Sequence, residues 1–85
     1  METNPTYYGL PARVQLEELG ENQLGIRKVI KSRIIRKDAE KIAQMARQIK
    51  SVNPALGLTL LCNRNICSKS LDLLREEEIE IRYMD

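Results

Sequence analysis

An apolar stripe in the middle of the chain most constrains what this sequence can fold into. Five aliphatic residues recur there at i, i+3, i+4, i+7 and i+10: Ala39, Ile42, Ala43, Ala46 and Ile49. This is the spacing of one face of an amphipathic helix. The pattern predicts a helix from about Lys37 to Lys50. Asp38 near its start and Arg47 near its end suit the helix macrodipole.

Alternation before this helix predicts a β-hairpin. Residues 13–17 alternate polar and apolar side chains, and residues 20–23 (GENQ) form a turn signal. The second strand is expected where apolar residues fall on even positions: Leu24, Ile26, Ile30 and Ile34. This strand would turn Arg27, Lys31 and Arg33 to solvent. The same residues also fit helical spacing, so one long basic helix over residues 26–50 stays open as the alternative.

The C-terminal third predicts a strand–helix–strand unit. Residues 58–62 (LTLLC) resemble a buried strand, and Asn65 or Ser68 is a candidate cap for the following helix. Residues 79–83 alternate again, and two such strands are expected to be parallel neighbours. The fold class is therefore α/β, at the α+β boundary, with a small mixed sheet and two helices in the order β-β-α-β-α-β. We expect a polar N-terminal strap (1–11) and one domain (12–85).

Composition narrows the function classes. The chain has 85 residues, no Phe, no Trp and three Tyr, so its small core must be aliphatic. Stacking of bases on exposed aromatic side chains is nearly excluded. No apolar run approaches the ~20 residues of a membrane span, and residues 1–11 lack the features of a secretory signal. Together with only two cysteines, these features predict a cytoplasmic protein that does not contact membranes.

Residues 27–37 (RKVIKSRIIRK) concentrate positive charge. They hold six bases and no acid, whereas the rest of the chain has 8 bases and 12 acids. The six are Arg27, Lys28, Lys31, Arg33, Arg36 and Lys37. Clustered bases favour phosphate contacts, so the leading prediction is a non-catalytic module that binds DNA or RNA. The alternatives are a solvated face balanced by the protein's own acidic end, an acidic protein partner, or self-association as a homodimer.

Two further segments carry candidate sites. Asn63, Arg64 and Asn65 follow a predicted buried strand and precede a helix, which is where α/β sheets bind anions. The acidic run Glu76 to Glu78 is expected to be solvated or to contact the basic segment of a second copy. The chain has no His, so a Cys–His nucleophile is excluded and Cys62 and Cys67 cannot complete a zinc site by themselves.

Residues 29–81 resemble the C-terminal half of a restriction-endonuclease-like nuclease core. The resemblance lies in the order of elements and in Lys31, which stands at the lysine of the family's Glu-x-Lys strand, with Glu17 or Glu18 as the acid of the first strand. It implies Lys31 and Glu18 as catalytic residues and Mg²⁺ as the cofactor. Position 29 is Val where the family has a metal-binding acid, so the resemblance predicts a fold that retained binding and lost cleavage.

Residues 16–29 also resemble a helix-turn-helix. Leu19 and Gly20 would precede the turn, and Ile26 and Val29 would lie inside the second helix. This resemblance implies that the basic side chains of Arg27, Lys28 and Lys31 face the major groove of DNA or its phosphates.

Overall fold

The structure, a computed structural model, describes all 85 residues and confirms the predicted β-β-α-β-α-β order. A short 3-10 helix, η1, precedes it. The elements are η1 (Pro5–Tyr8), β1 (Gln15–Gly20), β2 (Gln23–Lys28), α1 (Arg36–Val52), β3 (Gly57–Cys62), α2 (Ser68–Glu76) and β4 (Ile79–Tyr83). The strands form one mixed sheet in the order β1-β2-β3-β4. β1 and β2 are antiparallel, and β2, β3 and β4 run parallel.

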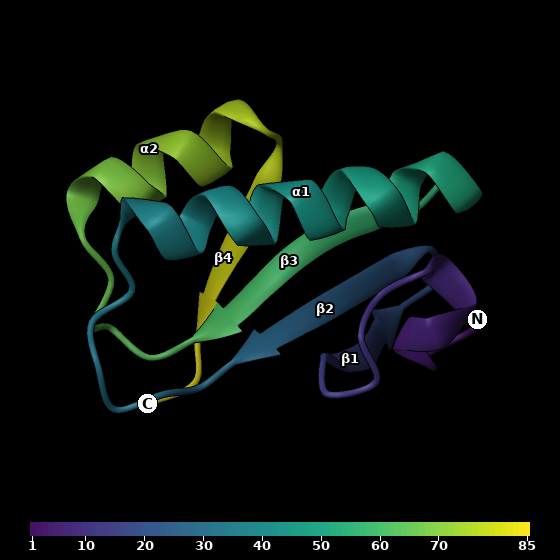
Figure 1. The fold of residues 1–85 in the computed structure, drawn as a ribbon, viewed down its shortest axis with the longest axis horizontal. Helices are drawn as coiled ribbons and strands as arrows, with labels where there is room; N and C mark the ends of the chain where they lie inside the picture. Colours follow the sequence, from purple (N-terminus) through teal and green to yellow (C-terminus); the bar gives the residue numbers. More distant parts are fainter.

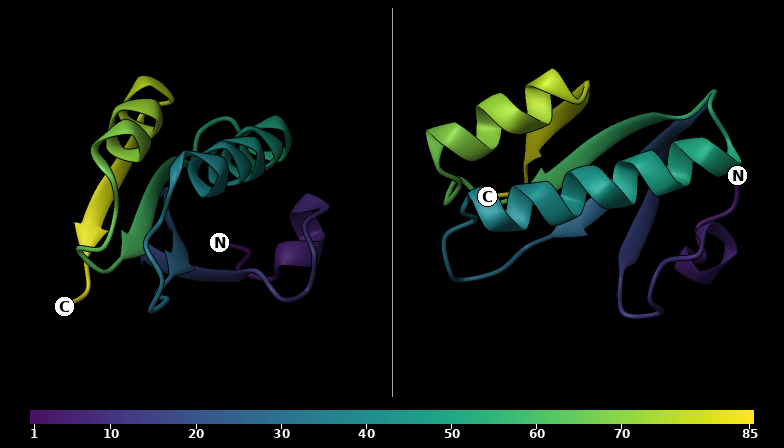
Figure 2. Two further views of the ribbon diagram at one scale, coloured as in Figure 1. Left: turned by 60° about the vertical axis from the view of Figure 1, so that its left-hand side comes forward. Right: turned by 45° about the horizontal axis from the view of Figure 1, so that its top comes forward.

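Both helices cover the same face of the sheet, and the core lies between the two layers (Figures 1 and 2). β3 is central, and its run of aliphatic residues is buried on both faces, as the sequence predicts. The helical stripe is confirmed, since all five of its residues are buried against the sheet. Aliphatic side chains from the two layers therefore supply nearly the whole core.

The hairpin is confirmed and rules out both helical interpretations of residues 16–36. Its turn is Glu21 and Asn22, and Asn22 adopts a left-handed backbone (φ 58°) that Asn tolerates. The first strand runs from Gln15 to Gly20 instead of 13–17. A register shift between Glu18 and Gly20 marks a bulge near the turn. Residues 16–29 are therefore no helix-turn-helix.

The second strand ends at Lys28, six residues before the predicted end. Lys28 pairs with Cys62, the last residue of β3, so the backbone beyond it has no neighbouring strand. Residues 29–35 form a loop, and Arg36 begins α1. Within the predicted extension of the strand, only Ile34 forms a β-type contact. It makes an isolated parallel bridge with Ile66 and is fully buried.

The helix boundaries follow from their caps. Asp38 Oδ2 accepts a hydrogen bond from the Ile35 amide (3.1 Å), which fixes the start of α1. The N-cap of α2 is Cys67, whose Sγ accepts from the Ser70 amide (3.4 Å), so the prediction of Asn65 or Ser68 is wrong. Asn65 bonds elsewhere, as described below. Neither helix combines the length and apolar character that crossing a membrane requires.

The N-terminal segment adds two side chains to the core. Tyr8 and Leu10 are buried beside α1, and the Tyr8 hydroxyl donates to the Glu2 carbonyl (2.6 Å). Burial raises the pKa of this hydroxyl. The segment predicted as a polar strap therefore packs beside α1 and closes part of the core (Figure 2).

Candidate functional site

The basic segment lies at the carboxyl end of the parallel strands. Arg27 and Lys28 close β2, Lys31 and Arg33 lie in the loop, and Arg36 with Lys37 opens α1. These six residues come from three segments that meet at one end of the sheet, which we call the basic end. Figure 1 shows the end of β2 and the start of α1 on this side. The prediction that Arg27, Lys31 and Arg33 lie on one face of a strand is wrong, because the strand ends at Lys28.

Most cations of the basic end have no carboxylate partner. Arg27 pairs with Glu17 (Nη1–Oε2 3.9 Å) and Arg36 with Glu40 (Nε–Oε1 3.4 Å). The side chains of both pairs are at least 40% exposed, so the pairs contribute little stability and exchange easily for another anion. The remaining four cations make no salt bridge: Lys28, Lys31, Arg33 and Lys37.

The acidic run lies at the opposite end of the sheet. Glu76 to Glu78 immediately precede β4, whose first residue pairs with Leu58, whereas Lys28 pairs with Cys62. Four residues along β3 correspond to roughly 13 Å at about 3.3 Å per residue. The Debye length at physiological ionic strength is only about 8 Å. Glu76 to Glu78 therefore lie too far away to balance the basic segment of the same chain. Asp85, the last residue of the acidic C-terminal segment, lies beside the end of β3 and pairs with Arg64.

The side chain of Asn65 holds the basic loop in place. Its Nδ2 lies within hydrogen-bond distance of three successive carbonyl oxygens, those of Ile30 (2.9 Å), Lys31 (3.2 Å) and Ser32 (2.6 Å). The backbone adds two bonds, from the Ile34 amide to the Asn65 carbonyl (2.8 Å) and from the Cys67 amide to the Ile34 carbonyl (3.1 Å). The backbone that carries the cations is thus tied to the loop after β3.

The predicted anion-binding loop already uses its strongest donors. Arg64 pairs with Asp85 through its side chain (Nε–Oδ1 3.8 Å) and its amide (N–Oδ2 3.4 Å), and its guanidinium lies 5.0 Å from the Tyr83 ring centre. The amide group of Asn65 holds the basic loop, while its buried Oδ1 has no hydrogen-bond partner. Asn63 is half-buried beside them. In the structure, the polar groups of this loop therefore bind Asp85 and the backbone of residues 30–32.

The two thiols differ in environment. Cys62 is buried on the helix side of the sheet, and desolvation raises its pKa. A hydrogen bond between Cys67 Sγ and the Ser70 hydroxyl (2.9 Å) lowers the pKa of Cys67. Both cysteines are free, and no group of three or more His, Cys, Asp or Glu side chains converges as a metal site.

The residues implied by the nuclease resemblance do not lie together. Glu18 pairs with Leu24 near the hairpin turn, whereas Lys31 lies in the loop beyond the other end of β2. Glu17 lies closer to the basic end, where it pairs with Arg27. Cleavage stays a prediction that follows from the resemblance alone.

The starts of both helices add positive potential to the basic end. Arg36 and Lys37 occupy the first turn of α1, and α2 begins with Ser68 and Lys69 and has no acid in its first turn. A helix N-terminus carries a partial positive charge, so bases are disfavoured there. Asp38, which caps α1, and Glu40, which pairs with Arg36, offset part of this cost. The charge distribution at this end therefore acts against the stability of the free protein.

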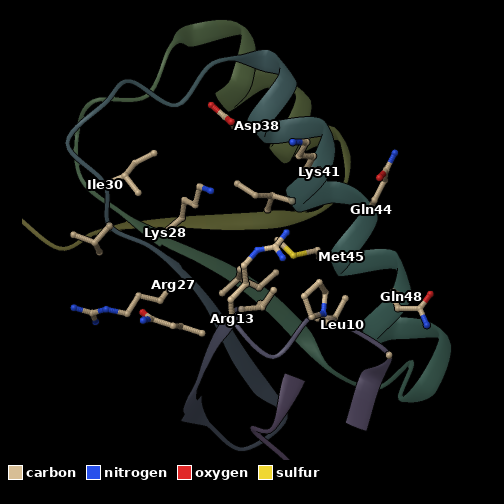
Figure 3. Close-up of a pocket in the computed structure, with 17 residues that line it drawn as sticks. Leu10, Arg13, Arg27, Lys28, Ile30, Asp38, Lys41, Gln44, Met45 and Gln48 are labelled. Carbon is tan, nitrogen blue, oxygen red and sulfur yellow. The ribbon is translucent and has the colours of Figure 1, made fainter. Parts of the chain in front are cut away.

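A groove of about 610 Å³ adjoins the basic end. It lies between the segment 9–15, the end of β2 and the outer side of α1 (Figure 3). Arg13, Lys28 and Lys41 point into it from these three segments. Arg13 and Lys41 were missed as site residues, although Lys41 follows Lys37 by one helical turn and the hairpin register places Arg13 beyond the pair Gln15–Arg27.

No protein family model, curated protein or solved structure matches this chain. The resemblance to a nuclease core therefore stays a prediction.

Proposed function

We propose that the protein is a small, non-catalytic nucleic-acid-binding module that holds a phosphate backbone at its basic end. The observation that carries this proposal is the set of four cations without salt bridges, in a chain whose acidic run Glu76 to Glu78 lies at the other end of the sheet. Unpaired cations are ready to replace the counterions of a polyanion without first breaking protein contacts.

The anchored loop supports this function. Since Asn65 fixes the backbone of residues 30–32, less conformational entropy is lost when Lys31 and Arg33 bind than in a free loop. The binding needs no metal or cofactor and reads the backbone rather than the base sequence. Free thiols suit the reducing cytoplasm predicted from the sequence.

Salt dependence tests the proposal. We expect the protein to bind labelled DNA or RNA in fluorescence anisotropy, with an affinity that falls roughly a hundredfold between about 50 and 200 mM salt, as four phosphate contacts predict. The double variant Lys31→Ala/Arg33→Ala removes two cations of the basic end. Its salt slope should fall by about 2.

A matched control separates position from charge. Lys50→Ala/Arg75→Ala removes two cations that also lack salt bridges, from the last turns of α1 and α2 at the other end. It changes the net charge equally and should leave both affinity and slope near those of the wild type. Equal losses in both variants, or no binding at low salt, would contradict the proposal.

A second function is favoured by the separation of charge itself. Because the basic segment lies at one end of the sheet and Glu76 to Glu78 at the other, two antiparallel copies would bring each basic segment to an acidic run in an isologous dimer. A self-assembly module of this kind should be dimeric at low salt and monomeric at high salt in light scattering. A monomer at every salt concentration would eliminate it.

A further inference from the structure

The groove beside α1 collects positive charge that the fold itself does not neutralise. Arg13, Lys28 and Lys41 point into it from three separate segments, and none of them makes a salt bridge (Figure 3). Bringing like charges toward one space costs free energy unless an anion occupies it. The convergence of three elements on one space distinguishes this site from a row of lysines on a single helix.

The only acid lining the groove is already engaged. Asp38 accepts the hydrogen bond that caps α1, from the Ile35 amide. The remaining polar lining consists of Arg27, which pairs with Glu17, and of amides, of which Gln44 and Gln48 lie along the outer rim (Figure 3). Amides both donate and accept hydrogen bonds. The groove therefore offers cations at its centre and neutral, adaptable groups at its edge.

The lining of the groove also has an apolar part. Ile26 and Ile42 lie beneath it and are almost fully buried, and Val14, Ile30 and Met45 are half-buried around them. Inorganic phosphate would leave this surface without a partner, and an uncharged apolar ligand would leave the three cations without one. The lining matches a ligand in which an anionic group is joined to an apolar unit.

We infer that the groove takes one unpaired nucleotide of a single strand, with a phosphate on Arg13, Lys28 and Lys41 and the base against the aliphatic lining. This inference rests on the proposed function, since Lys28 belongs both to the basic end and to the groove. The volume of about 610 Å³ lies within the range of small-molecule sites. In a duplex, stacking hides the base faces, so only a single strand offers one to the groove.

An oligonucleotide without bases tests the base contact. A twelve-nucleotide thymidine strand and an abasic strand of equal length carry the same phosphates. We expect the protein to bind the thymidine strand at least about fivefold more tightly, the lower end of the range for bases on aromatic side chains. A thymidine–adenine duplex of the same length should bind more weakly than the single strand in the same titration.

Paired variants test the groove itself. Lys41→Ala removes a groove cation from an exposed helical position, and Lys50→Ala is the matched control on the same helix. Val14→Trp fills the groove, and Val52→Trp places the same bulk at an exposed position on α1. We expect Lys41→Ala to weaken the binding of both strands, which Lys50→Ala should not do. Val14→Trp should abolish the preference for the thymidine strand, which Val52→Trp should retain. Circular dichroism checks folding, and Lys41→Ala preserves the test if Val14→Trp does not fold.

The outcomes separate this inference from the proposed function. Equal binding of the thymidine and abasic strands, with Lys41→Ala behaving like Lys50→Ala, would overturn the groove as a nucleotide site. Phosphate binding at the basic end would remain intact. No binding of any strand at low salt would overturn both. Binding to vesicles of anionic phospholipid in place of the oligonucleotides would likewise overturn both and assign the groove to a lipid headgroup.

Discussion

The two ends of the sheet differ in how the protein treats its own charge. At the acidic end, Glu77 is bound to Arg47 by a short ion pair (Nε–Oε1 2.7 Å), and Arg75 lies in the last turn of α2. At the basic end, four cations have no such partner. Both ends place charge where the helix dipole disfavours it, and each offsets part of that cost with ion pairs, at the basic end through Arg36 and Glu40. The basic end is the candidate for a polyanion because its unpaired side chains are cations.

The connections at the two ends also differ. The hairpin turn at the acidic end has only two residues, Glu21 and Asn22, whereas the loop at the basic end spans residues 29–35. The longer loop is fixed by a buried side chain, Ile34, and by the hydrogen bonds of Asn65. A long loop with this many anchors presents its cations in a defined arrangement, as binding requires.

The largest expected effect tests whether the basic loop is part of the core. Ile34→Ala should lower the free energy of unfolding by about 2–5 kcal/mol, because it leaves a cavity at a fully buried site. The neighbouring Ile35 is half exposed, so Ile35→Ala is the matched control and should change little. Urea denaturation measures both. Similar losses in the two variants would mean that the loop is not anchored by Ile34.

The next effect compares one asparagine at each end. Asn65→Ala removes the donor to three loop carbonyls and should cost about 1–3 kcal/mol, with faster hydrogen exchange over residues 29–35. Asn53 lies at the acidic end, where its Oδ1 accepts one exposed hydrogen bond from the Ala55 amide (3.2 Å). Asn53→Ala should cost at most about 0.5 kcal/mol. Unchanged hydrogen exchange over residues 29–35 in Asn65→Ala would mean that the Asn65 side chain does not hold the loop.

A smaller effect links stability to binding. Lys37→Glu places an acid in the first turn of α1 and should raise the free energy of unfolding by about 0.3–1 kcal/mol while weakening nucleic-acid binding. Lys50→Glu in the last turn should lower stability by a similar amount and leave binding unchanged. Thermal melts and anisotropy on the same samples measure both. A gain in stability without a loss of binding would mean that Lys37 does not contribute to nucleic-acid binding.

The smallest effect concerns the acidic end. The hydrogen bond from Arg47 holds the pKa of Glu77 below its usual value of 4.5. Its contribution to stability is therefore present above about pH 4.5 and is lost as the pH falls through the lower pKa of the folded state. Glu77→Gln and Arg47→Ala should each flatten the fall in stability below that pH, and the double variant should add nothing further. Additive effects would mean that the pair does not act as a unit.

The elements of the fold were predictable because their signals are local. The stripe from Ala39 to Ile49, the run at residues 58–62 and the alternation at residues 79–83 each depend on neighbours along the chain, and the structure contains all three elements. The end of β2 was not predictable in this way. Alternation continues to Ile34, but a strand needs a partner, and β3 stops at Cys62.

The candidate site divides along the same line. The amino-acid sequence by itself determined an aliphatic core, the order of strands and helices, and a run of six cations with no acid among them. Only the tertiary structure decided that Glu76 to Glu78 lie at the far end of the sheet and that Asn65 holds a loop 35 residues earlier in the chain. It also brought Arg13, Lys28 and Lys41 to one groove. Strand pairing and helix packing create these contacts, and periodicity along a single segment carries no information about either.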